Sequence, residues 1–346
     1  MKKKVKIAIL GGGGILGLHA PGFLRLADKC EVIAVAEPNP ACHDHIRHLL
    51  GKDVPIYADY KDALTLPDLD AVDIVLPHSL HVEATIAAAE KGLHVLCEKV
   101  MARNTCECHA MLDACRRAGV ELVITHDRRY TDGWIQLKRL IEVGTLGDIL
   151  YIKMEHNQNV ETSPSSWIRS KEQVGGGAIM SCLTHQIDAL RWYLGEVESV
   201  TCMTQTLPSR MEGECIGVVN AKMKTGALAS LAINWHTKSE ITGDHVLWYE
   251  FNHVCGTLGE AYYMHGRGAF LKMADDEDGG FTKMEQVTDL SGHQGCIEEF
   301  IKKIRGEPSE VLTFGHDAIK TVEVAQAAYL SETTGCTVAL PLAEDR

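Results

Sequence analysis

The sequence predicts a two-domain α/β protein, in which a doubly wound parallel sheet precedes an α+β domain with a large, open, mostly antiparallel sheet. Up to about residue 126, short apolar runs alternate with helical segments, which is typical of a parallel sheet covered on both faces. From residue 127 onward, longer runs with alternating apolar and polar residues follow one another without helices between them, which is typical of an antiparallel sheet. We therefore expect domains at 1–126 and 127–346.

Each expected element has its own signal. Apolar runs predict buried strands in the first domain at 5–10, 31–37, 71–77, 94–99 and 121–126. Helices separate them, and glycines at 51, 92 and 119 end three of these helices. In the second domain, a helix at 132–144 and a strand at 148–157 precede a helix that follows Gly177. Further strands are expected at 199–207, 215–224, 226–236, 246–254 and 259–265, and two last helices at 295–306 and 316–335.

The composition excludes several classes of partner. The chain has 34 Lys and Arg against 47 Asp and Glu, a formal net charge of −13, which disfavours nucleic acid and anionic membranes. No stretch approaches the ~20 apolar residues of a membrane span. The lysines before the first apolar run imitate a signal peptide, but the glycines at 11–14 favour a strand and its turn. The 12 cysteines do not form a small disulfide scaffold, so we expect reduced thiols and a cytoplasmic protein.

Two segments, CECH at 106–109 and HDHIRH at 43–48, raise the question of a metal site. On a helix, Cys106 and Cys108 point to nearly opposite sides, which suits one tetrahedral ion poorly. His45 and His48 share a helical face, but no acidic or cysteine partner is evident. We therefore expect no metal site.

A glycine-rich turn follows the first strand and opens a helix. Gly12, Gly14 and Gly17 fit the pattern G-x-G-x-x-G, whereas Gly11, Gly13 and Leu16 fit it with the third glycine replaced. In either register the backbone can approach a pyrophosphate at the helix N-terminus. The residues expected at the cofactor are Gly11, Gly12, Gly13, Gly14, Ile15 and Leu16.

Glu37 strengthens this interpretation. It ends the second strand, 20 residues after Gly17, where a carboxylate accepts hydrogen bonds from the adenosine ribose. The same carboxylate repels a 2′-phosphate. The turn and Glu37 together predict a Rossmann domain that prefers NAD over NADP.

The ends of two further strands carry polar side chains. Ligands of open α/β sheets bind beyond the carboxyl ends of the strands, where the segments LPHSLH at 76–81 and CEKVM at 97–101 lie. A lysine there can hydrogen-bond a substrate hydroxyl or take part in proton transfer, although a surface lysine at a loop start is the alternative. The residues expected near the nicotinamide are Leu76, Pro77, His81, Glu98 and Lys99.

The helix after Gly177 carries His185, four residues after Ser181 and three before Asp188. It could be a helix histidine bonded to a carbonyl, a metal ligand or a catalytic base. No second His or Cys shares its face, which argues against a metal. Oxidation of a secondary alcohol removes a hydroxyl proton while hydride leaves to the nicotinamide, and a group that titrates near pH 7 suits this step. Of these three roles for His185, we therefore favour the catalytic base.

The order of the motifs resembles the Gfo/Idh/MocA family, the relatives of glucose–fructose oxidoreductase and inositol dehydrogenase. The segments are GGGGILGLH, AEPNP, LPHSLHVEA, GLHVLCEKVMARN, RRYTDGWIQLKRLIEVGTLGDI, WIRSKEQVGGGAIMSCLTHQIDALRWYLG and DAIKTVEVAQAAYLSETTG. Together they cover nearly the whole chain. The resemblance implies an N-terminal Rossmann domain that binds NAD(P), a C-terminal α/β domain on a large open sheet, and a substrate that lies between the two.

The resemblance also implies roles for single residues. The lysine of the family's E-K-P segment falls on Lys99, with Val100 in place of proline, and the active-site histidine falls on His185. RRYTDGW is most similar to the inositol dehydrogenase branch, in which the first arginine, here Arg128, lies by the substrate and the nicotinamide. Asp188 is expected to contact a substrate hydroxyl.

Two positions depart from the family pattern. Ser181 stands where the family often has an aspartate, and Leu183 stands where it often has glycine. On a helix Ser181 still lies beside His185, but a hydroxyl cannot stabilise an imidazolium as a carboxylate does. Either Asp188 or a carboxylate elsewhere does so, or His185 stays neutral.

We therefore expect an NAD-dependent oxidoreductase that oxidises a ring secondary hydroxyl of a sugar, glycoside or cyclitol, or reduces the keto form. His185 is the expected base, and Lys99 holds the same oxygen. Candidates to line the substrate pocket are Tyr130, Trp167, Trp235 and His236. Two alternatives stay open: an NAD-recycling glycosidase or lyase that acts through a transient keto-sugar, and a non-catalytic NAD or sugar sensor. The open second sheet predicts a homodimer or homotetramer.

Overall fold

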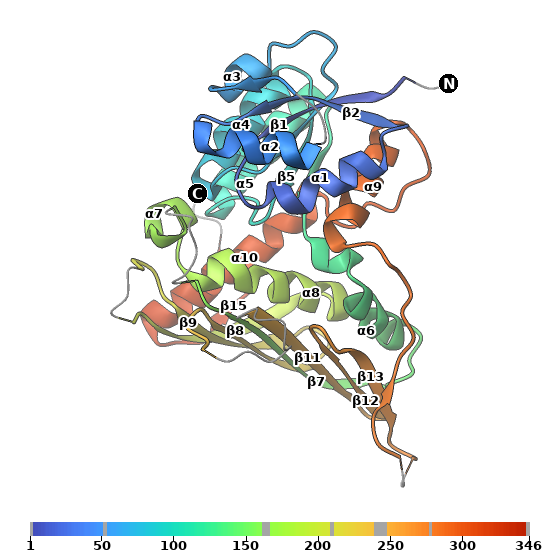
Figure 1. The fold of residues 1–346 in the computed structure, drawn as a ribbon. Helices are drawn as coiled ribbons and strands as arrows, with labels where there is room; N and C mark the ends of the chain where they lie inside the picture. The colour runs from blue at the N-terminus through green and yellow to red at the C-terminus, as the bar shows by residue number, and fades with distance from the viewer. Residues whose placement is uncertain are drawn as a thin grey trace. The chain divides into compact units, whose positions relative to one another are not determined.

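The computed structural model describes residues 3–50, 54–160, 167–207, 211–238, 248–276 and 279–343. The chain forms two compact units, residues 1–130 with 290–319 and residues 131–289 with 320–346, and each is built on one sheet (Figure 1). The sequence placed residues 290–319 in the second domain, whereas they pack with the first unit. The apolar face of a helix does not by itself show which sheet it covers. Gly51 and residues 246–247, expected in a helix stop and a strand, lie outside the described residues.

The first unit contains, within its described residues, a six-stranded parallel sheet in the order β3-β2-β1-β4-β5-β6. Its strands are β1 (Val5–Leu10), β2 (Cys30–Ala36), β3 (Ile56–Tyr57), β4 (Ala71–Ile74), β5 (His94–Glu98) and β6 (Leu122–Thr125). The chain moves outward from β1 to β3 and then returns to the other side of β1 with β4. This is the doubly wound order, and its ligands bind where the order reverses, beyond the carboxyl ends of β1 and β4.

Helices cover this sheet. They are α1 (Leu16–Arg25), α2 (His43–Leu50), α3 (Tyr60–Ala63), α4 (His78–Glu90), α5 (Thr105–Ala118) and α9 (Gly292–Ile304), with short 3₁₀ turns at Pro40–Cys42 and Asp127–Tyr130. The side chains of Ile7, Ile9 and Phe300 are almost fully buried in the core between α1, α9 and the strands. Gly22 lets α1 approach α9, because a Cβ there would lie 2.7 Å from Ile297 Cδ1. Helix α9 thus belongs to this core through close packing.

The second unit contains, in the part of the chain that is described, a nine-stranded sheet in the order β14-β13-β12-β11-β7-β10-β9-β8-β15. The strands are β7 (Ile149–Gln158), β8 (Val197–Gln205), β9 (Ile216–Met223), β10 (Leu228–Asn234), β11 (Trp248–Gly256), β12 (Gly259–Met264), β13 (Gly268–Met273), β14 (Thr282–Lys283) and β15 (Val338–Ala339). Neighbours are antiparallel except β10 and β7, which are parallel. The predicted fold class is confirmed in both units.

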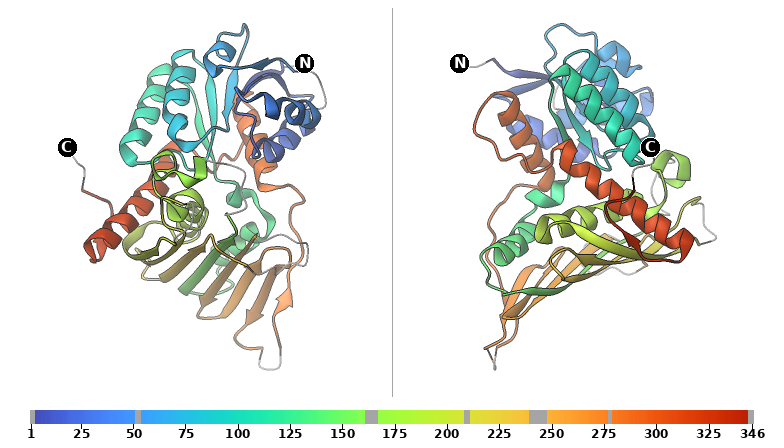
Figure 2. Two further views of the ribbon diagram at one scale, coloured as in Figure 1. Left: turned by 60° about the vertical axis from the view of Figure 1, so that its left-hand side comes forward. Right: turned by 180° about the vertical axis from the view of Figure 1, so that it is seen from behind.

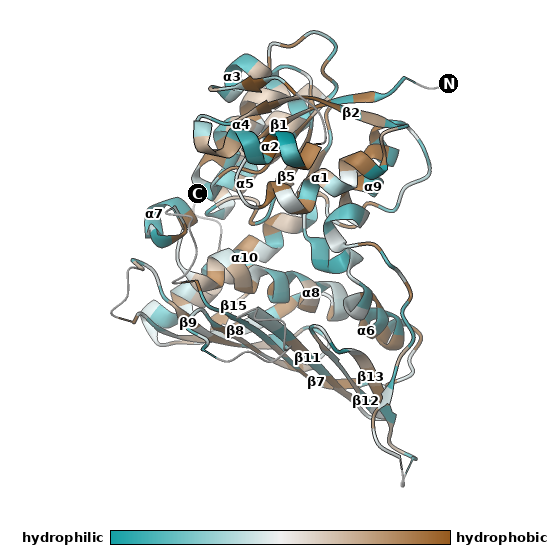
Figure 3. Cartoon of the chain, in the orientation of Figure 1, coloured by the Kyte–Doolittle hydropathy of each residue, from teal (hydrophilic) through white to brown (hydrophobic). Residues whose placement is uncertain are grey.

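One face of the second sheet is covered by helices α6 (Asp132–Glu142), α8 (Thr184–Leu194) and α10 (Gly315–Thr334), as Figures 1 and 2 show. Two shorter segments, α7 (Lys171–Val174) and a 3₁₀ turn (Trp167–Arg169), precede α8. The strands alternate accordingly: in β9, Val219 and Ala221 are buried, whereas Val218 and Asn220 are exposed. Figure 3 shows the same mixture of apolar and polar residues along these strands. No helix of the described residues is long and apolar enough to cross a membrane.

Candidate active site

The glycine turn lies between the end of β1 and the start of α1. Gly11 has a φ of +111°, and its Cβ would lie 2.5 Å from the carbonyl oxygen of Val75. A Cβ on Gly12 would lie 2.5 Å from Ile46 Cδ1, whereas Gly13 and Gly14 have nothing within 4 Å. Packing against the backbone therefore requires glycine at position 11, whereas at position 12 the nearest neighbour is the end of a side chain. The next two keep the loop open in front of a helix N-terminus, which is where a pyrophosphate binds.

The environment of Gly17 favours one of the two registers. It lies inside α1, and a Cβ there would meet nothing within 4 Å. Close packing of helix on sheet therefore does not require glycine at 17, and the fully buried Leu16 occupies the third position instead. The structure thus favours the register that begins at Gly11, with Ile15 as the N-cap residue of α1.

Glu37 follows β2 and is held in place by the backbone. One carboxylate oxygen accepts a hydrogen bond from the Gly12 N–H at 2.8 Å, and the other accepts one from the Asn39 N–H at 2.8 Å. These bonds fix the carboxylate directly beside the glycine turn. An adenosine ribose in this turn would therefore meet a positioned acceptor, and a 2′-phosphate would meet a negative charge.

His81 lies in the first turn of α4, after Leu76 and Pro77. Its side chain is fully buried, and its two ring nitrogens lie 2.9 Å from the carbonyl oxygens of Val100 and Leu76. Burial lowers the pKa of His81 in spite of these hydrogen bonds. The imidazole therefore ties the loop after β4 to the loop after β5, while Leu76 and Pro77 are half-buried at the strand end.

Lys99 follows the last residue of β5 and is half-buried. Its backbone N–H donates to Glu98 Oε2 at 3.1 Å, and the peptide bond from Lys99 to Val100 is cis. The carboxylate of Glu98 thus fixes the backbone from which the lysine side chain projects.

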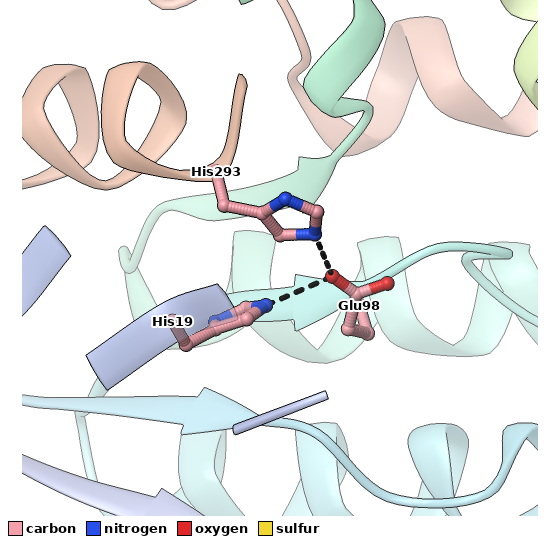
Figure 4. Close-up of side chains that lie close together, drawn as sticks. All are labelled: His19, Glu98 and His293. Carbon is pink, nitrogen blue, oxygen red and sulfur yellow. Dashed lines mark hydrogen bonds and ion pairs between the residues drawn. The ribbon is translucent and has the colours of Figure 1, made fainter. Parts of the chain in front are cut away.

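Glu98 is itself the centre of a buried cluster (Figure 4). Its Oε1 atom lies 2.9 Å from His19 Nε2 and 3.4 Å from His293 Nε2. The second nitrogen of His19 lies 2.8 Å from Asp73 Oδ2. This cluster joins α1, β4, β5 and α9, so it connects the helix after the glycine turn to the strand that ends at Lys99.

Within this cluster, the histidines and carboxylates stabilise one another's charged forms. Burial alone would lower the pKa of His19, but the Asp73 and Glu98 carboxylates outweigh it and raise that pKa to about 10. Burial would likewise raise the pKa of Glu98, but hydrogen bonds from His19 and His293 hold it well below its usual range. At neutral pH the cluster is therefore an imidazolium bonded to two carboxylates.

This cluster is better suited to protons than to a metal ion. One nitrogen of His19, one of His293 and a Glu98 oxygen lie within 4.8 Å of one another. A metal there would have to displace a proton whose pKa is about 10. Sequence reasoning missed His19, Asp73 and His293. Asp73 had a usable signal, since a carboxylate inside an apolar strand is rarely buried without a partner.

Arg128 and Tyr130 lie in the 3₁₀ turn after β6. Arg128 forms an ion pair with Asp127, whose carboxylate also lies 3.5 Å from His293 Nδ1. Tyr130 belongs to the core of the first unit, where its hydroxyl accepts a hydrogen bond from the Leu312 N–H at 3.1 Å. Core packing therefore explains Tyr130.

In the second unit, close packing explains why glycines precede His185. A Cβ on Gly176 would lie 2.2 Å from the Tyr329 hydroxyl, and one on Gly177 would lie 2.4 Å from the Glu214 carbonyl oxygen. The Tyr329 hydroxyl accepts hydrogen bonds from the N–H groups of Gly177 and Met180. Glu214 Oε1 accepts one from the Ile179 N–H at 2.9 Å. Glu214 and Tyr329 therefore cap the first turn of this helical segment.

The segment does not form the regular α-helix that the sequence predicts. Residues Ile179–Leu183 form a π-helical turn, and α8 begins only at Thr184. Such turns are frequent at functional sites. The assumed α-helical spacing between Ser181 and His185 therefore does not apply, and the Cys182 thiol contacts the Ser181 hydroxyl at 3.7 Å.

His185 is buried in the first turn of α8, next to a second histidine. Its ring lies parallel to that of His156 on β7, with 6.3 Å between the ring centroids. His156 Nδ1 lies 3.2 Å from Glu250 Oε1 on β11, and Gln186 donates to the same oxygen at 3.0 Å. Glu250 is thus a carboxylate near His185 that sequence reasoning left unnamed.

His156 carries a positive charge at neutral pH. Burial would lower its pKa, but hydrogen bonds with Cys182 and Glu250 raise it to about 9. A cation beside His185 disfavours a second charge there, which favours the neutral imidazole that a base requires. His156 and Glu250 occupy inward positions of alternating strands. A polar residue at such a position, among apolar ones, is the feature of the sequence that could have identified them.

The remaining expected residues lie in different environments. Asp188 is fully buried and accepts a hydrogen bond from the Thr321 hydroxyl at 3.3 Å. Trp235 is buried in the core, and its backbone N–H donates to the Cys215 carbonyl oxygen. Trp167 and His236 are half-buried. Packing therefore explains Trp235, whereas Trp167 and His236 stay candidates.

Comparisons with known proteins give matches to both units of the chain. Residues 5–126 match a model described as "Oxidoreductase family, NAD-binding Rossmann fold", and residues 134–262 match the "GFO/IDH/MocA C-terminal domain". The chain is 32% identical over 219 residues to levoglucosan dehydrogenase of Pseudarthrobacter phenanthrenivorans, and this alignment covers 60% of the chain and 56% of that protein. It is 25% identical to myo-inositol 2-dehydrogenase of Thermotoga maritima over 96% of the chain and 100% of that protein.

A solved structure shows the same fold over its whole length. The crystal structure of the WlbA dehydrogenase from Chromobacterium violaceum, in complex with NADH and UDP-GlcNAcA, has a TM-score of 0.83 and 27% identity, and covers 99% of this chain and 98% of that one. The chain spans slightly more than half the length of levoglucosan dehydrogenase in the alignment above. Because models of two successive parts of one family together match more than half of the chain, this protein belongs to the Gfo/Idh/MocA oxidoreductase family and has its NAD-binding Rossmann domain.

Proposed function

We propose that this protein is an NAD-dependent dehydrogenase that oxidises a secondary hydroxyl on the ring of a sugar, glycoside or cyclitol, or reduces the corresponding ketone. The main support for the proposal is the environment of the His185 side chain. It lies beside a π-helical turn, parallel to a histidine that the Glu250 carboxylate keeps charged. In an NAD-binding family, a buried imidazole held in this way fits a proton acceptor better than a structural residue.

The residues of the first unit fit NAD. Gly13 and Gly14 leave room at the N-terminus of α1, and the Glu37 carboxylate is fixed beside the turn. When bound, the cofactor accepts or donates the hydride. The protein supplies the pyrophosphate turn, the ribose acceptor and the rigid loops that His81 and Glu98 hold.

The proton chemistry falls to Lys99 and His185. As the carbon that bears the substrate hydroxyl loses its hydride, His185 accepts the hydroxyl proton, and the Lys99 side chain stabilises the oxygen by a hydrogen bond. The His19–Glu98 cluster keeps the Lys99 backbone in place. Arg128, Trp167, Ser181 and Asp188 stay candidates for substrate contacts. For Asp188 such a contact would have to replace or share its bond to Thr321.

The substrate class rests on the relatives. One of them is named for levoglucosan, another for myo-inositol, and a third was crystallised with a nucleotide sugar. The compounds in these names all contain a ring that carries secondary hydroxyl groups. We therefore assign this chain a ring polyol, and its NAD preference follows from Glu37.

A turnover screen tests the proposal. The purified protein is incubated with NAD and a panel of sugars, glycosides and inositols, and NADH absorbance is followed, with a His185→Ala variant as control. We expect NADH to accumulate with at least one ring polyol and not with the variant. Product formation without NADH would instead establish the NAD-recycling alternative. NADH binding without turnover of any ring polyol would establish the sensor.

We further propose that the enzyme is a homodimer or homotetramer joined through the sheet face of the second unit that its described helices leave open. Met203, Leu228 and Val218 are large apolar residues exposed on its strands, and such patches mark interfaces. The 12 free cysteines fit a reducing compartment such as the cytoplasm. Light scattering should give a mass above that of the 38.0 kDa chain. A monomer at micromolar concentration would refute the proposal.

A further inference from the structure

A second group of ligand-type side chains lies on the second sheet, away from His156 and Glu250. His253 and Cys255 are two residues apart on β11, and Glu260 on β12 pairs with Cys255 in the strand register. The strand alternation buries Asn252 and Val254 and turns His253 and Cys255 toward the face that the described helices leave open. Three side chains of different chemistry thus meet on two hydrogen-bonded strands.

The distances within this trio match those expected for metal ligands. His253 Nε2 lies 3.0 Å from Glu260 Oε2 and 3.6 Å from Cys255 Sγ, and all three donor atoms lie within 4.8 Å of one another. A tetrahedral zinc ion with N and O ligands at ~2.0–2.1 Å and S at ~2.3 Å separates N from O by about 3.3 Å and N from S by about 3.6 Å. The side chains therefore need only small movements to share one ion.

We propose that His253, Cys255 and Glu260 bind a zinc ion on the open face of the second sheet. Thiolate, imidazole and carboxylate together favour Zn²⁺, because Mg²⁺ and Ca²⁺ prefer oxygen ligands alone. On binding, the ion takes the place of the thiol proton of Cys255, which leaves to solvent. A water molecule completes the fourth position.

The surroundings suit an ion that enters from solvent. The side chains of His253 and Glu260 are 25% and 51% exposed. Strand β7 separates β11 and β12 from β8, β9 and β10, which carry the apolar residues of the proposed interface, so an entry path exists outside that apolar patch. Both strands belong to a continuous sheet, and the ligands flank the turn at residues 256–259, so their spacing is held by backbone hydrogen bonds. The ion would join β11 to β12 and stabilise the second unit in proportion to its concentration.

Metal titration of the full-length protein tests the inference. The protein is stripped with a chelator and titrated with Zn²⁺ against a competing chromophoric chelator, and with Co²⁺ to detect thiolate-to-metal charge-transfer absorption. The variants are Cys255→Ser and His253→Gln. The matched control is Cys336→Ser, which removes an exposed thiol elsewhere in the same unit.

We expect one Zn²⁺ per chain for the wild type and for Cys336→Ser. Cys255→Ser and His253→Gln should each bind more weakly by at least the ~10–100-fold that loss of a supporting residue costs a metal site. The cobalt charge-transfer band should be absent only in Cys255→Ser. Equal zinc affinity in Cys255→Ser and the wild type, or no tight binding in the wild type, would overturn the proposal. An affinity that rises with protein concentration would show a site shared between chains and would equally contradict it.

Discussion

At the scale of single residues, we propose that Glu37 sets the cofactor preference. Because both carboxylate oxygens are held by backbone N–H groups, its negative charge cannot turn away from a 2′-phosphate. Glu37→Ala, combined with Asn39→Arg on the neighbouring loop, should shift the ratio of NADPH to NADH affinity upward by at least about tenfold, or roughly 1.4 kcal/mol. Fluorescence titration of both reduced cofactors measures the ratio. Equal affinity of the unmodified protein for the two would show that Glu37 does not discriminate.

A second prediction at this scale concerns His156 and Glu250. Glu250→Gln removes the carboxylate that keeps His156 protonated, so the positive charge beside His185 is lost at neutral pH. Protonation of the base then becomes easier, and the acid limb of the turnover–pH profile should move to higher pH. His156→Gln should move it in the same direction, which guards against a folding defect in one variant. An unchanged limb in both folded variants would exclude His156 from this role.

At the scale of elements, the structure requires glycine at position 11 of the glycine turn but not at position 17 in α1. Gly17→Ala should raise the stability of α1 by up to about 1 kcal/mol, because the added methyl group meets no neighbour and alanine favours helix. NADH affinity should not change. Gly11→Ala should destabilise the first unit by about 1–3 kcal/mol, because it combines a positive φ with a clash against the Val75 carbonyl.

Denaturant unfolding and NADH titration of both variants check this prediction. If Gly17→Ala instead weakened NADH binding, the register that begins at Gly12 would be the functional one.

Elements also show what the sequence could and could not predict. The alternation of apolar and polar residues predicted β7 to β12, since each of these strands has one buried face. The glycines at 11–14 predicted the turn between β1 and α1. The π-helical turn before His185 was not predicted, and the groups that bond to the N–H groups at its start, Glu214 and Tyr329, come from segments distant in the chain. His19 and His293 were missed for the same reason: their partner is the carboxylate of Glu98, and only the fold brings them together.

At the scale of the whole molecule, the buried cluster makes stability depend on pH. The pKa of His19 is about 10 in the folded protein and about 6.5 in an unfolded chain. The folded state therefore holds one more proton between these values. Stability from His19 should be complete below pH 6.5 and should fall by about 1.4 kcal/mol per pH unit as pH rises toward 10. Glu98 acts at the other end, since its lowered pKa removes stability as pH falls below about 4.5.

Urea unfolding at several pH values, followed by a probe of the first unit, measures this dependence. His19→Gln should flatten the alkaline slope. A wild-type stability that stayed constant between pH 7 and 9.5 would show that His19 is not charged in the folded protein.

We propose that the first unit binds NAD and that His185 of the second unit removes the substrate proton. The most direct test compares NADH affinity and kcat of the wild type with those of His185→Ala, on the substrate that the screen identifies. We predict unchanged NADH affinity and a kcat lower by ~10²–10⁴. Lys99→Ala should lose a comparable amount, and the double variant should lose less than the product of the two, because both groups serve one oxygen. A His185→Ala variant that binds NADH normally and turns over at the wild-type rate would show that His185 is not the base.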